Sequence, residues 1–193
     1  MQLPKLITGP VIEPVTLAEA KAQCRVDISD DDTLITTLIG DAREYCERID
    51  WRAYLTQTYD LYLDEFPASG EIRFPRPPLQ SVTSVKYTDE NGVVATLASS
   101  TYIVDTISEP ARLVLKSNQS WPTVTLQQVN GVVVRFVAGW TQASDVPRSI
   151  KRAMLLLIGH WYENREETTV GAVSRSIEFG VRALLGVDSA KRF

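Results

Sequence analysis

Three zones of the chain differ in how hydrophobic and polar positions follow one another. From about residue 14 to 55, apolar residues recur at steps of three and four, which places them on one face of a helix. From about residue 56 to 140, apolar positions alternate with polar ones, as in strands that bury one face. Helical spacing returns after Asp145. Helices segregated from strands in this order predict an α+β protein.

The first zone predicts a short helix followed by a long one. Thr16-Leu17-Ala18-Glu19 has the spacing of a capping box, in which Thr16 accepts an early backbone N–H and Glu19 reaches back. The short helix is expected to end near Cys24. Asp30, Asp31 and Asp32 precede the long helix, at the end where its dipole favours negative charge. Its apolar face comprises Leu34, Ile35, Leu38, Ile39, Ala42, Tyr45, Cys46 and Ile49.

The middle zone predicts an antiparallel β unit. An Asn-Gly turn in Asp89-Glu90-Asn91-Gly92, between two β-type runs, is the clearest hairpin signal in the chain. The run Val129–Val137 is rich in valine and is expected at the centre of its sheet. Strands are expected at residues 59–64, 72–74, 82–87, 93–97, 102–105, 112–115 and 129–137.

The last zone predicts one more long helix and a terminal arm. Asp145-Val146-Pro147 suits a helix start, and apolar spacing continues from Ile150 to Trp161, so the helix is expected to reach about Arg165. Residues 166–176 are expected to form a loop, and Val181 to Leu185 a short amphipathic segment.

The simplest architecture is one domain over residues 1–193. Its helical layer comes from both chain ends, from residues 14–55 and 145–165, and consists of a short helix, a long helix and a later long helix. An antiparallel β insertion occupies residues 56–140, and a C-terminal arm occupies residues 166–193.

Composition and charge narrow the classes of function. Hydrophobic residues make up 44% of the chain and charged residues 23%, which is typical of a folded globular protein. A net charge of −4 argues against broad binding to DNA phosphates. Cys24 and Cys46 lie on helical patterns and are expected to be reduced and buried. No run predicts a signal peptide or a membrane span, so synthesis in the cytosol is expected.

Candidate chemistry is sparse. His160 is the single histidine, so any Ser-His-Asp or Cys-His triad would have to include it, and no nucleophile motif accompanies it. The aspartates from Asp27 to Asp32 lack the order of a calcium loop, because the sixth position is Asp32 and not glycine. One histidine and two distant cysteines make no zinc pattern. We therefore predict no catalytic residue, no metal and no cofactor.

Large aromatic residues offer another kind of site. The densest group is Trp161-Tyr162-Glu163-Asn164-Arg165, and tryptophan, tyrosine and arginine dominate the energetics of protein interfaces. This group has two interpretations: a contact surface for a partner, or a helix C-terminus that packs on the β unit.

A collinear series of short stretches carries a family resemblance. The most distinctive is Pro75-Arg76-Pro77-Pro78-Leu79-Gln80-Ser81-Val82. The others are Pro14 to Lys21, Val26-Asp27, Asp31-Asp32, Ala42 to Tyr45, Thr56 to Thr58, Tyr102 to Asp105, Trp121-Pro122, Val137 to Trp140, Val146-Pro147, His160 to Glu166 and Phe179-Gly180-Val181. Together they resemble the phage head–tail connector (head completion, or adaptor) proteins, in the branch that carries a β insertion.

The resemblance implies a mechanical role without catalysis. Copies of the protein would dock on the portal protein at the head–tail junction after DNA packaging, as a ring that is dodecameric in the virion. The ring would extend the DNA channel, through which DNA passes without specific binding, and would offer a platform to the next neck or tail-completion protein. The protein would be made in the bacterial host cytoplasm, with no membrane partner.

The resemblance also implies that the C-terminal segment, from about Val170 to Phe193, reaches the portal. The residues predicted at the portal or subunit interface are Trp161, Tyr162, Arg165, Phe179, Val181, Leu184, Leu185, Lys191, Arg192 and Phe193. Two other classes stay open: a non-catalytic binding module with a different partner, and an enzyme with an unusual site centred on His160.

Overall fold

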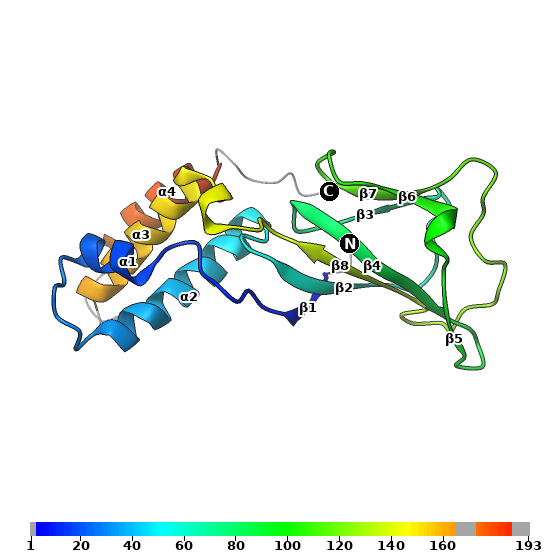
Figure 1. Cartoon of the computed structure of the whole chain (residues 1–193), viewed down its shortest axis with the longest axis horizontal. Helices are drawn as coiled ribbons and strands as arrows, with labels where there is room; N and C mark the ends of the chain where they lie inside the picture. The colour runs from blue at the N-terminus through cyan, green and yellow to red at the C-terminus, as the bar shows by residue number, and fades with distance from the viewer. Residues whose placement is uncertain (1–2, 165–172, 187–193) are drawn as a thin grey trace. The chain divides into compact units, whose positions relative to one another are not determined.

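The computed structural model describes residues 3–164 and 173–186. Within these ranges the chain forms two compact units. Residues 3–10 and 56–139 form a β unit, and residues 11–55, 140–164 and 173–186 form a helical unit. Figure 1 shows helices in one unit and strands in the other. The α+β class predicted from the sequence is confirmed.

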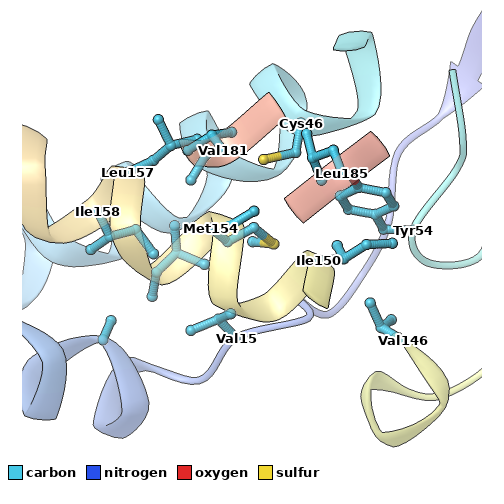
Figure 2. Close-up of a cluster of buried hydrophobic side chains, with 14 of the residues drawn as sticks. Val15, Cys46, Tyr54, Val146, Ile150, Met154, Leu157, Ile158, Val181 and Leu185 are labelled. Atoms are coloured by element: carbon cyan, nitrogen blue, oxygen red, sulfur yellow. The ribbon is translucent and has the colours of Figure 1, made fainter. Parts of the chain in front are cut away.

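The helical unit is organised around its third helix. Its helices are α1 (Leu17–Cys24), α2 (Asp32–Asp50), α3 (Arg148–Glu163) and α4 (Val173–Gly186). Helix α3 contacts each of the other three. Figure 2 shows side chains of α2, α3 and α4, with Val15 from the segment before α1, meeting in one apolar core. The fully buried Ile150, Met154 and Ile158 lie along α3 at helical spacing, as the sequence pattern predicts.

Side-chain capping fixes where α1 begins, whereas the N-cap of α2, Asp31, makes no side-chain cap hydrogen bond. The capping box predicted for α1 is present: Glu19 N donates to Thr16 Oγ1 at 3.2 Å, and Thr16 N donates to Glu19 Oε2 at 2.7 Å. The helix ends at Arg25, in the left-handed conformation. Lys21 Nζ then donates to Asp32 Oδ1 at 2.6 Å, which ties α1 to the start of α2.

Helix α2 carries buried charge on its inner side. Arg43 is buried and donates to Glu13 Oε2 at 2.9 Å and to Glu47 Oε2 at 3.0 Å. The other oxygen of Glu47 accepts from Tyr54 N at 2.7 Å. Each carboxylate thus has a charged or polar partner, which offsets the cost of its burial.

The end of α2 is fixed by a second buried carboxylate. Asp50 Oδ2 accepts from Tyr54 Oη at 2.8 Å, and Asp50 Oδ1 accepts from Arg52 N at 3.1 Å. Between them, Trp51 takes the left-handed conformation, with φ of 62°, at the helix C-cap. Glycine is the usual residue there, so the Asp50 contacts hold the corner that glycine would otherwise form.

The β unit consists of two antiparallel sheets. One has the strand order β1-β2-β8-β4-β5 and the other β3-β7-β6. The bounds are β1 (Lys5–Thr8), β2 (Gln57–Leu63), β3 (Glu71–Arg73), β4 (Leu79–Thr88), β5 (Val94–Thr96), β6 (Tyr102–Asp105), β7 (Arg112–Leu115) and β8 (Val132–Ala138). The valine-rich β8 is the central strand of its sheet, as predicted.

Aromatic side chains form the core between the two sheets. Phe136 of β8 stacks on Tyr59 of β2, with ring centroids 5.5 Å apart. Phe74, which follows β3, meets Phe136 at 5.1 Å. The predicted hairpin is also present, since β4 pairs with β5. Its turn is held by Asp89 Oδ1, which accepts from the backbone N–H groups of Asn91 and Val93.

Two sequence predictions need correction. The loop expected over residues 166–176 is wrong for 173–176, which belong to α4, while 166–172 lie outside the described residues. The amphipathic segment expected at Val181 to Leu185 is therefore the end of a longer helix. Val173, Ile177, Val181 and Leu185 repeat every four residues, and intervening serines and Gly180 obscure that periodicity. Strand β1 was not predicted.

Candidate assembly interface

The described residues contain no group of three or more His, Cys, Asp and Glu side chains placed to hold a metal ion. None of their helices is long and apolar enough to cross a membrane. His160 lies near the end of α3, where Asn164 Nδ2 is 3.1 Å from its ring Nδ1 and donates to its backbone oxygen at 3.0 Å. These contacts help to end the helix.

The predicted interface residues on α3 have partners inside the helical unit. Trp161 meets the ring of Tyr45 edge-on, with centroids 5.9 Å apart. Tyr162 Oη donates to Asp31 Oδ2 at 2.6 Å. Both side chains are half-buried. Trp161 and Tyr162 thus hold the end of α3 against α2. The sequence-based alternative to a partner surface was a helix end packed on the β unit, so these partners within the helical unit differ from that prediction.

Helix α4 has one buried and one exposed face. Val181 and Leu185 are fully buried, and Leu184 packs against the same core. On the other side, Phe179 is 76% exposed, and Arg182 and Ala183 are also exposed. Of the interface residues predicted on this helix, only Phe179 offers a large apolar surface to a partner. The buried residues hold α4 on the hydrophobic core, so the exposed ring of Phe179 is available to contact a partner.

Four predicted interface residues lie outside the described residues: Arg165, Lys191, Arg192 and Phe193. Phe179 is therefore the member of the predicted set whose placement the structure both describes and leaves accessible.

The β unit exposes several aliphatic side chains that the sequence pattern does not identify as interface candidates. Four of them lie at the two edges of the five-stranded sheet: Leu6 and Ile7 on β1, Val93 just before β5 and Val94 on β5. A signal for β1 was present, because Leu6-Ile7 lies between Pro4 and Gly9-Pro10, which bound a short strand. The hairpin signal pointed to β5, but nothing in the sequence indicated that its valines would remain exposed.

The sequence of the chain matches a known protein family. Residues 14–112, more than half of the chain, match the family model described as phage gp6-like head-tail connector protein. The chain belongs to this family. The match starts in the segment before α1 and extends into β7, so it includes parts of both units of the connector. A search of curated proteins finds no match.

Solved structures with the same fold support the comparison. The connector is similar to a chain in the neck of an empty gene transfer agent particle solved with C6 symmetry, with a TM-score of 0.78 and 21% identity. The alignment covers 98% of the connector and 97% of that chain. A chain of the native neck solved with C12 symmetry gives a TM-score of 0.75 at 20% identity, over 98% and 97% of the two chains. A chain of the native virion gives 0.79 at 19% identity, over 99% and 97%.

Family membership gives the connector its broad role, which is that of a structural protein of the phage neck.

Proposed function

We propose that the connector adds to the portal ring at the head–tail junction after DNA packaging. It extends the DNA channel there and offers a platform to the next neck or tail-completion protein. The observation that carries this proposal is the family match, together with a fold shared over nearly the whole chain with structures from particle necks. Those necks were solved with C6 and C12 symmetry, and a dodecameric ring of the connector is the corresponding arrangement.

The proposed portal contact is the C-terminal arm, from residue 166 onward, with the exposed face of α4. Phe179 supports it, because a 76% exposed aromatic ring on a helix is costly in water and is typical of residues that dominate protein contacts. Val181 and Leu185 have a supporting role in this contact, since their burial holds α4 on the helical unit.

Removal of the gene tests the role. The expected lysate contains heads that leak DNA or are empty, beside complete free tails, when imaged by electron microscopy. Normal infectious virions from the deletion strain would refute the proposal. They would favour the alternative, a non-catalytic binding module with a different partner.

A variant tests the portal contact separately. We expect Phe179→Ser to reduce the amount of connector that co-sediments with purified portal-bearing heads, with little change in folding because the side chain is 76% exposed. Val129→Ser is the matched control, since Val129 is also an exposed apolar residue at 65% but lies in the β unit. Equal binding by the two variants would show that Phe179 is not part of the contact with the portal.

The proposed function involves no catalytic reaction. We expect His160→Ala to support virion assembly at the yield of the unmodified protein, because the His160 ring contacts Asn164 at the end of α3, where it helps to end the helix. Loss of infectivity in this variant, with the unfolding temperature unchanged, would instead support an enzyme centred on His160. Complementation of the deletion strain and plaque counting give the measurement.

A further inference from the structure

The two end strands of the five-stranded sheet resemble each other. In the part of the chain that the structure describes, β1 and β5 each pair with a strand on one side only. Each therefore presents a row of backbone N–H and C=O groups on its free side. Both strands are short, with four and three residues respectively.

Both ends are also apolar. Leu6 and Ile7 are 49% and 40% exposed on β1, and Val93 and Val94 are 62% and 61% exposed at the start of β5. Folded proteins usually protect free strand edges with charged residues, prolines or irregular pairing. Strand β1 has Lys5 and a register shift, but β5 contains no charged residue and no proline. Exposed aliphatic residues on open edges favour pairing with another strand.

The strand order fixes the direction in which the two ends can meet. Every pairing along β1-β2-β8-β4-β5 is antiparallel, so strand direction reverses four times and β1 and β5 run the same way. In a ring, each copy is related to the next by rotation about a single axis, and the contact joins two different surfaces. Such a rotation preserves strand direction around the ring. Strand β5 of one copy would therefore meet β1 of the next in parallel.

Charge favours this same alignment. In a parallel pair, the N-terminal ends of both strands lie at the same end of the junction. Lys5 is exposed at the start of β1, and Glu90 is exposed in the turn that precedes β5. The two opposite charges would meet in the parallel arrangement. In an antiparallel contact between two copies of β1, Lys5 would instead approach the Thr8 end of its partner.

We propose that neighbouring copies of the connector join β5 of one copy to β1 of the next, which continues the five-stranded sheet from subunit to subunit. The partner for both edges is thus a second copy of this chain. This inference rests on the proposed ring and names the subunit contact that builds it.

Cross-linking between variants that each carry one added surface cysteine tests the contact. Cys24→Ala serves as the background, because Cys24 is half-buried while Cys46 is fully buried and its thiol pKa is strongly raised by desolvation. Ile7→Cys and Thr96→Cys proteins are assembled on portal-bearing heads, separately and mixed, and treated with a short bismaleimide. We expect cross-linked dimers in the mixture alone. A variant with both cysteines should give a ladder of higher oligomers.

The controls separate this contact from other arrangements. Ile103→Cys replaces Thr96→Cys in a control mixture, since Ile103 is 57% exposed on β6, an edge strand of the other sheet. Dimers with Ile103→Cys at the same yield, or dimers from Ile7→Cys alone, would overturn the proposal, the latter by indicating a two-fold β1–β1 contact. If unmodified connector binds heads but the mixture gives no dimers, the inference fails while the proposed function survives. If unmodified connector does not bind heads, the proposed function fails.

Charge exchange gives a second measurement that leaves the aliphatic residues intact. Lys5→Glu and Glu90→Lys should each lower the amount of connector bound to heads several-fold, because like charges then face each other at every junction. The double variant should restore binding to nearly the level of the unmodified protein. Additive losses in the double variant would overturn the proposed pairing.

Discussion

At the scale of single residues, the most unusual feature of the connector is the charge buried around α2. Glu13, Glu47 and Asp50 lie near Arg43 and Arg52, and most of these groups have little access to water. Burial raises the pKa of Glu13, and the nearby Arg43 only partly offsets this effect. For Asp50, desolvation raises the pKa from 3.8 to about 6, against the opposing effect of the hydrogen bond from Tyr54. The corner after α2 thus depends on a carboxyl group whose charge state changes at mildly acidic pH.

The Asp50 carboxyl makes a specific contribution to the pH dependence of stability. Its folded-state pKa is raised, so its favourable contribution is complete below the unfolded value near 3.8 and is lost as pH rises to about 6. Asn at this position can keep its oxygen for the Arg52 N–H and donate from its amide nitrogen to Tyr54 Oη, and it cannot ionise. We expect Asp50→Asn to match the parent near pH 4 and to exceed it by up to about 3 kcal/mol in unfolding free energy at pH 7.

Urea unfolding of both proteins, followed by circular dichroism at several pH values, measures this difference. The comparison between the two proteins removes the contribution of carboxyls with lowered pKa, such as Asp105, whose pKa is about 2 because it accepts hydrogen bonds from Ser108 and Ile107. A difference in unfolding free energy that does not change between pH 4 and pH 7 would show that Asp50 does not titrate in this range.

At the scale of secondary-structure elements, α4 links the structural core to the proposed portal contact. Leu185 is fully buried in the helical unit and Phe179 is largely exposed, although both belong to one helix. We expect Leu185→Ala to lower the free energy of unfolding by about 2–5 kcal/mol, because truncation leaves a cavity in a packed core. Phe179→Ala should change it by less than about 0.5 kcal/mol. Chemical denaturation of the two variants gives both values.

Equal destabilisation by these two substitutions would contradict the packing of α4. A small effect of Leu185→Ala would mean that α4 does not pack on the core in solution. The interpretation of Phe179 as an exposed residue on a packed helix would then be wrong as well.

Periodicity predicted most elements because most of them bury one face. Apolar residues alternate along β2 and β8 and recur at steps of three and four along α2 and α3, because in each element they form the buried face. Strand β1 was missed because all four of its residues are exposed, so no buried face imposed an alternating pattern. The first part of α4 was missed because small polar residues interrupt its spacing.

The contacts and exposure of the candidate interface residues could not be predicted from such patterns. Trp161 and Tyr162 were selected for residue type, but their contacts with Tyr45 and Asp31 depend on the approach of α3 to α2, which no local pattern records. Exposure of Phe179 and of the β1 and β5 side chains is likewise a property of the assembled fold, because a sequence shows that a residue is apolar but not which neighbours cover it.

At the scale of the whole molecule, net charge sets how the connector behaves beside DNA. Lysine and arginine number 20 against 24 aspartate and glutamate residues, which gives a net charge of −4. Several of the basic groups are already paired, among them Arg135 with Asp60 on the five-stranded sheet and Arg112 with Asp105 and Glu71 on the other. A surface with this balance of charges neutralises few DNA phosphates and therefore releases few counterions, so the expected attraction to DNA is weak.

We therefore expect no retention of duplex DNA by the purified connector at protein concentrations up to about 10⁻⁴ M and physiological salt, a range in which non-specific DNA-binding proteins already form complexes. Fluorescence anisotropy of a labelled duplex, titrated at two salt concentrations, makes the measurement, and a basic DNA-binding protein is the positive control. Tight binding that weakens steeply with salt would contradict this expectation and indicate a basic surface on the protein. Absence of binding would agree with a channel wall past which DNA moves freely, since each attractive phosphate contact in a closed ring would be repeated in every subunit and would slow the passage of DNA.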